Sequence, residues 1–164
     1  MKKITFLTLI SLLTLNSIAQ NKFGHIDSQE LMQMMPEVKA AEEALSQHMQ
    51  SLGEQEAALT GEYQQKVQEF TANEATYDDL IKQDKYAEIK SLEQRIQVFR
   101  EDAQQSVQKK QLDLMEPINK KAIQAIEDVA KEGEYTYIFD KAAGILYAKD
   151  SENILSLVKK KLGL

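Results

Sequence analysis

Two long series of apolar residues, separated by one polar break, constrain the fold of this chain more than any other feature. Within each series the apolar residues recur mostly every three or four positions, the spacing of a helix with one apolar face. Each helix alone leaves its apolar strip in water, so the two are predicted to pair as an antiparallel coiled-coil hairpin. The first series is Val38, Ala41, Leu45, Met49, Leu52, Leu59, Tyr63, Val67, Phe70 and Tyr77. The second is Ile89, Leu92, Ile96, Phe99, Ala103, Val107, Leu114, Ile118, Ala122, Ala125 and Val129.

The polar break lies at residues 76–85, where Asp78, Asp79 and Asp84 interrupt the apolar spacing. The tip of the hairpin is predicted there, and the projecting arm is assigned to residues 45–115.

Three residues inside the predicted helices weaken them. Gly53 and Gly61 each cost about 1 kcal/mol relative to alanine, and Pro117 removes a backbone hydrogen bond. Two interpretations stay open: tolerated local weakness, or places where a long arm bends.

Before the first series, residues 22–26 read as a strand. Asp27 and Glu30 have the spacing of a capping box, which predicts the start of a short helix over residues 31–35. Pro36 then suits the first turn of a new helix, because its missing N–H has no intrahelical partner there.

After the second series the period changes to two. Tyr135, Tyr137 and Phe139 fall on one face of a predicted strand. Residues 140–144 contain glycine and are predicted to connect this strand to a return strand over residues 145–148, as a β hairpin.

A last helix is predicted to begin at Asp150–Glu152 and to end at Lys159–Lys161, with Gly163 just beyond it. Acidic residues first and lysines last suit the helix dipole.

Residues 1–19 have the pattern of a cleavable export signal. Lys2 and Lys3 precede an apolar stretch over residues 4–15, and Ser17-Ile18-Ala19 is a small-x-small cleavage site. A retained membrane anchor is the alternative, but a spanning helix needs about 20 apolar residues. Cleavage leaves a mature chain from near Gln20, exported from the cytoplasm and without stable membrane insertion.

Composition argues against catalysis. The chain has no cysteine and two histidines, which excludes disulfides, thiolate zinc sites and cysteine nucleophiles. His25 and His48 have no companion at metal-ligand spacing. The carboxylates lack an apolar pocket that would prepare one of them for acid–base work, so a hydrolase is disfavoured. No catalytic residue, cofactor or metal site is predicted.

The remaining residues, 20–44 and 116–164, are assigned to a β/α body. A body of this size is marginal alone and its short sheet has open edges, so we predict that it is completed by oligomerisation. The fold class is therefore α+β and predominantly α, with the helical hairpin projecting from a small sheet. The residues assigned to the oligomer body are Phe23, Ile26, Tyr135, Tyr137, Phe139, Ile145 and Tyr147.

In this layout the chain resembles the Skp/OmpH family of periplasmic chaperones. The matching local stretches are residues 23–31 (FGHIDSQEL), 134–140 (EYTYIFD), 144–148 (GILYA) and 151–154 (SENI). The resemblance implies a homotrimer with three tentacle-like hairpins around a cavity. It further implies a holdase that shields unfolded outer-membrane β-barrel proteins without ATP.

Apolar residues outside the two series are the candidates for client binding. They are Leu80, Ile81, Tyr86, Val98 and Met115. Flexible or aromatic side chains suit promiscuous partners. The alternative interpretation is that each residue belongs to the seam between the helices, displaced from the regular spacing, or packs at the tip.

Charge separates this chain from the basic members of that family. The formal net charge is -6, and the first arm helix carries two lysines against eight glutamates. This disfavours nucleic acid, lipopolysaccharide phosphates and acidic clients as partners. An alternative function is a non-catalytic envelope scaffold or spacer that binds a fixed partner through its coiled coil.

Overall fold

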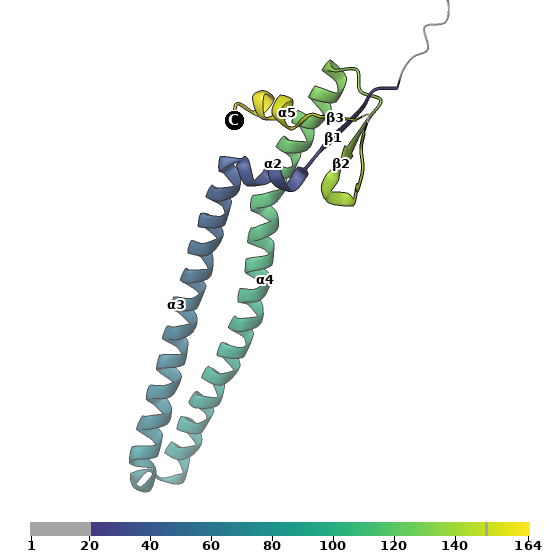
Figure 1. The fold of residues 1–164 in the computed structure, drawn as a ribbon. Helices are drawn as coiled ribbons and strands as arrows, with labels where there is room; N and C mark the ends of the chain where they lie inside the picture. The colour runs from purple at the N-terminus through teal and green to yellow at the C-terminus, as the bar shows by residue number, and fades with distance from the viewer. Residues whose placement is uncertain (1–20, 150) are drawn as a thin grey trace, which may run out of the picture. The chain divides into compact units, whose positions relative to one another are not determined.

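The computed structural model describes residues 21–149 and 151–164 (Figure 1). The predicted class, predominantly α with a long helical hairpin and a small sheet, is confirmed. The predicted export signal, residues 1–19, lies outside the described residues. The elements in chain order are β1 (Phe23–Ile26), α2 (Ser28–Met34), α3 (Pro36–Asn73), the 3-10 turn η1 (Glu74–Thr76), α4 (Asp79–Glu132), β2 (Tyr137–Asp140), the 3-10 turn η2 (Lys141–Ala143), β3 (Ser151–Asn153) and α5 (Leu155–Leu162).

The chain divides into two compact units. The described residues up to Leu31, with Gln124–Leu164, form the sheet unit, and Met32–Ile123 form the hairpin unit. The sequence analysis places this division further along the two long helices, at residues 45 and 115. The difference arises because the pairing of α3 with α4 continues to an ion pair between Glu37 and Lys121.

In the hairpin unit, α3 and α4 run antiparallel side by side (Figure 1). The buried apolar residues of the unit come largely from the two predicted series, with Ala41 on α3 and Leu92, Ile96, Ile118 and Ala122 on α4. The helical period of the sequence therefore places the seam correctly.

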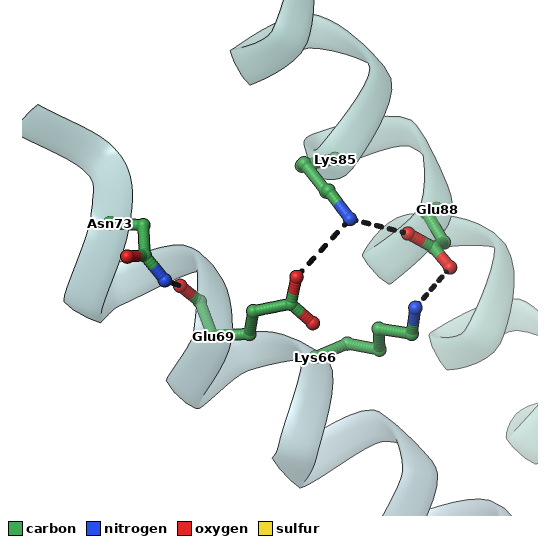
Figure 2. A network of polar contacts seen from close by, with 5 residues as sticks. All are labelled: Lys66, Glu69, Asn73, Lys85 and Glu88. Carbon is green, nitrogen blue, oxygen red and sulfur yellow. Dashed lines mark hydrogen bonds and ion pairs between the residues drawn. The ribbon is translucent and has the colours of Figure 1, made fainter. Parts of the chain in front are cut away.

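Polar contacts fix the register of the two helices. Near the turn, Lys66 Nζ on α3 lies 2.7 Å from Glu88 Oε1 on α4 (Figure 2). Lys85 on α4 pairs with Glu69 on α3 and with Glu88 on its own helix. In each cross-helix pair the midpoint between the two residue numbers falls at 77–78. All these pairs therefore belong to one antiparallel register around the same turn. These pairs are Lys66 with Glu88, Glu69 with Lys85, Glu56 with Arg100 and His48 with Ser106.

The turn is narrower than the predicted tip at residues 76–85. The helix α3 ends at Asn73, and α4 already begins at Asp79. The Asp78 side chain accepts a hydrogen bond from the Ile81 N–H at 2.9 Å, as an N-cap does. The acidic residues that break the apolar spacing therefore start the second helix, and residues 79–85 are helical.

The two helices pass through all three residues that were expected to weaken them. The helix α3 is continuous through Gly53 and Gly61, and α4 is continuous through Pro117. A Cβ atom built at either glycine meets no atom within 4 Å. Neither glycine is needed for close packing.

The sheet differs from the predicted β hairpin, which is wrong. Its strand order is β2-β1-β3, and both outer strands run parallel to β1. Phe23 pairs with Tyr137 on one side and with Ser151 on the other. The first strand of the chain is thus the central strand, and β2 and β3 do not pair with each other.

The segment after β2 explains this difference. Gly144 has a φ of 102°, a left-handed conformation that glycine adopts freely, and it ends η2. Residues 145–148, the predicted return strand, form no strand. Because Ser151–Asn153 pairs with β1, the last helix begins at Leu155, later than predicted, and ends before Gly163 (φ 77°) as expected.

One face of the sheet is packed against the interior of its own unit. Ile26, Ile154 and Val158 are buried there. Gly24 allows close approach on this face, since a Cβ atom at residue 24 would lie 2.6 Å from the Ile138 side chain. Ile26, assigned above to the oligomer body, therefore belongs to the core of the sheet unit.

Candidate functional site

The opposite face of the sheet carries a row of aromatic rings. Alternation along β1 and β2 brings Phe23, Tyr137 and Phe139 to this face. Phe23 lies 6.2 Å from each of the other two rings, and Tyr137 lies 6.1 Å from Phe139, measured between centroids. Tyr137 and Phe139 are nevertheless exposed. We name Phe23, Tyr137, Phe139, Ile145 and Tyr147 the aromatic face.

A hollow of about 350 Å³ lies on this face, with a mainly apolar lining. Phe23 and Phe139 form part of its wall, and Ile145 and Tyr147 line it from the segment after η2. The polar pair within the lining is His25 Nδ1 with Ser151 Oγ, 3.0 Å apart. Apart from this pair the surface offers little to a polar ligand and much to an apolar one.

Tyr135 lies on the packed side of the sheet, not in line with Tyr137 and Phe139 as predicted. The chain bends at Thr136 and β2 begins only at Tyr137, so Tyr135 lies outside the alternation of the strand. The Tyr135 hydroxyl donates a 2.5 Å hydrogen bond to Glu152, and Lys22 Nζ sits 4.0 Å from the ring centroid. Burial, followed by the hydrogen bond to Glu152, raises the pKa of Tyr135 to about 12.

Asp140 joins the end of β2 to the start of α2. Its carboxylate accepts hydrogen bonds from the Ser28 hydroxyl at 2.6 Å and from the Ser28 N–H at 3.2 Å. The Ala142 N–H donates to the same group at 3.0 Å. Burial acts to raise the pKa of Asp140, but these three donors outweigh it and the pKa is lowered. The contact is structural and holds β2 in place.

The outer surfaces of the two long helices differ. Among the described residues, α4 exposes six large apolar side chains, whereas α3 exposes only Met49. The surface of α3 is acidic, with seven glutamates and two lysines between Pro36 and Asn73. The six on α4 are Leu80, Ile81, Tyr86, Val98, Leu112 and Ile123.

Comparison with known proteins identifies the family of this chain. The family profile for outer membrane proteins described as OmpH-like matches residues 22–162, nearly the whole described chain. This chain belongs to the OmpH-like family.

A solved OmpH-like structure has the same fold. It comes from Caulobacter crescentus CB15 and is described as a candidate outer membrane chaperone. The TM-score is 0.77 at 13% sequence identity, over 87% of this chain and 83% of the other. No curated protein matches the sequence significantly.

Within this OmpH-like fold, the predicted client-binding residues divide into two groups. Leu80, Ile81, Tyr86 and Val98 are exposed on α4. Met115 is half-buried and lines a groove between α3 and α4 together with Val38 and Leu45. Met115 therefore contributes to the inner surface of the hairpin.

Two exposed apolar residues of α4 escaped the sequence analysis, Leu112 and Ile123. Both fall between members of the buried series and look like part of it when single residues are considered. Their spacing from Val98, 14 and 25 residues, is the signal that would have found them, because it corresponds to about four and seven helical turns.

Within residues 21–149 and 151–164, no three His, Cys, Asp or Glu residues come together as a metal site. In the same ranges, no helix is both long enough and apolar enough to span a membrane.

Proposed function

We propose that this protein is an ATP-independent periplasmic holdase that binds unfolded outer-membrane β-barrel proteins between helical arms and prevents their aggregation. The observation that carries the proposal is the row of exposed apolar side chains on α4, within an OmpH-like hairpin that is otherwise highly charged. A row of large apolar side chains on a charged surface offers contacts to an apolar partner.

The proposed assembly is a homotrimer joined through the sheet units. The aromatic face supports this, because Tyr137 and Phe139 are large, exposed and adjacent, with a mainly apolar hollow beside them. Aromatic residues are enriched where protein interfaces are fully buried. The cavity for the client would then be the space that the arms of three copies enclose.

The proposed location is the periplasm. Its support is the export-signal pattern of residues 1–19, together with membership of the family described as outer membrane protein, OmpH-like. Export and the absence of catalytic groups in the sequence fit a binding protein better than an enzyme.

Client binding in this protein is proposed to rely on apolar contacts rather than on charge. Residues 20–164 carry 18 basic and 26 acidic side chains, so attraction to lipopolysaccharide phosphates or to nucleic acid is disfavoured. Many weak apolar contacts within an enclosed space are sufficient for holding, because the local concentration is high.

The test is an aggregation assay with urea-unfolded barrel proteins and unfolded soluble proteins, diluted into buffer with and without the purified protein and without ATP. We expect barrel aggregation to be delayed at both low and high salt. If the protein delays no aggregation and instead binds one folded partner at fixed stoichiometry from a periplasmic extract, it would be the envelope scaffold.

A further inference from the structure

Four of the exposed apolar residues of α4 lie on one line along the helix. Val98 follows Leu80 by 18 residues, about five turns at ~3.6 residues per turn. Leu112 and Ile123 follow at intervals of 14 and 11 residues, about four and three turns. We name Leu80, Val98, Leu112 and Ile123 the α4 stripe.

The α4 stripe faces away from α3. Ile96, which is buried in the seam, precedes Val98 by two residues, about 200° around the helix. The exposed fractions run from 55% at Val98 to 71% at Leu80, so these side chains are not covered by the seam. The stripe is a second apolar line on α4, whose first apolar line is already buried against α3.

The positions between the stripe residues are small or polar. Ala87, Ser91, Gln94 and Gln105 follow the same line and are exposed. Two of the charges near the stripe are paired within α4 itself, since Lys109 Nζ lies 3.0 Å from Asp113 and Lys120 Nζ lies 2.6 Å from Glu116. The stripe therefore offers its contacts through apolar side chains.

The spacing of the stripe decides which kind of partner fits. A helix from another protein or a second copy would need an apolar residue about every 3.5 positions to form a seam. A stable dimer interface also needs about 800 Å² on each partner. The stripe residues are 11 to 18 residues apart, roughly 16–27 Å at ~1.5 Å per residue. An extended chain rises ~3.3 Å per residue and reaches between neighbouring sites within about five to eight residues.

From this geometry we infer that the α4 stripe is the surface of the hairpin that contacts the client, and that it takes an extended, unfolded polypeptide with apolar side chains. The inference rests on the proposed holdase function and assigns the contact to one helix of the two. The acidic outer surface of α3 keeps the hairpin soluble and takes little part in the contact.

The experiment compares matched variants of the purified protein. The stripe variant carries Val98→Gln and Leu112→Gln, and the control carries Met49→Gln, which removes the one large apolar side chain exposed on α3. Glutamine keeps helix propensity close to that of the residues replaced, and it already occurs along the same line. Circular dichroism and thermal melting check that both variants fold, and binding of a urea-unfolded barrel protein is measured by fluorescence.

We expect the stripe variant to bind about tenfold more weakly than the original protein, the change that two lost apolar contacts would bring, while Met49→Gln binds as before. A photocrosslinking residue at position 112 should capture the client, and the same residue at position 49 should not.

Three outcomes would overturn the inference. If both variants bind the client as the original protein does, the proposed holdase function stands and the assignment to α4 falls. If the original protein itself fails to hold any client, the proposed function falls and the inference with it. A lower sedimentation coefficient for the stripe variant would show that the stripe joins copies of this chain instead.

Discussion

The aromatic face of the sheet and the α4 stripe both expose apolar side chains, but they distribute them differently. On the sheet, the rings of Phe23, Tyr137 and Phe139 lie about 6 Å apart and form one continuous patch. On α4, the stripe residues lie 11 to 18 positions apart along the helix. A continuous patch can exclude water over a single area, as a lasting interface requires, whereas isolated contacts are each weak and quickly exchanged.

This difference fits the two tasks that the proposed function includes. A holdase needs a permanent assembly, and it must also release its client. Concentrating aromatic area on the sheet suits the first task, and dispersing aliphatic side chains along a helix suits the second.

The largest effect is expected from Phe139→Glu. A carboxylate placed within the aromatic face should raise the dissociation constant of the proposed assembly by on the order of 1,000-fold, as the loss of a buried hot spot does. Analytical ultracentrifugation should show monomers that keep their helical circular dichroism. Val98→Glu on α4 is the control and should leave the mass unchanged. An assembly that survives Phe139→Glu would break the comparison.

The next effect distinguishes the two faces of α4. Ile96→Ala should lower the free energy of unfolding by about 2–5 kcal/mol, because it leaves a cavity in the buried seam. Val98→Ala, two residues further on, should change it by no more than about 0.5 kcal/mol. Chemical denaturation measures both. Equal losses would show that the outward face of α4 is covered.

A smaller, opposite effect is expected from α3. Gly53→Ala combined with Gly61→Ala should raise the free energy of unfolding by about 2 kcal/mol in total, since each glycine is helical and an added Cβ meets only solvent. If arm bending at these residues serves client binding, the double variant will bind clients more weakly while keeping its sedimentation coefficient. Unchanged stability would indicate that α3 does not remain helical through these positions in solution.

The smallest effect is a pH dependence confined to the sheet unit. The pKa of Tyr135 is raised from 10.0 to about 12, so the folded state favours the protonated phenol. The stability contributed is complete below pH 10 and is lost as the pH rises towards 12. Chemical denaturation between pH 9 and 12 should show a steeper decline for the original protein than for Tyr135→Phe. Parallel declines would remove Tyr135 as the cause.

The hairpin was predictable because its cause is local. The spacing of residues such as Leu92, Ile96 and Ile118 follows the helical period, and these residues are buried where the period puts them. The position of the turn was less accurate, since the aspartates that break the pattern act as the cap of the next helix. Asp78 shows this with its bond to the Ile81 N–H.

The sheet was not predictable in the same way. Glycine near residue 144 and alternating residues on either side favoured a hairpin, which is a local structure. The actual partner of both later strands is β1, more than 100 residues away, and no local pattern records that pairing. Tyr135 was misplaced because the chain bends at Thr136 and the strand begins only at Tyr137, so the alternation on which its face was assigned does not extend to it.

The sequence by itself determined the helical hairpin, the apolar seam and the resemblance to the OmpH-like family, since helix period and capping depend on residues within a few turns of each other. Only the tertiary structure decided which apolar residues remain exposed. Leu112 and Ile96 are equally apolar in the sequence and lie on opposite sides of α4, and pairing with α3 buries the side of Ile96 and leaves the side of Leu112 in solvent. Burial depends on what lies opposite a residue, and in this protein that neighbour comes from a distant part of the chain.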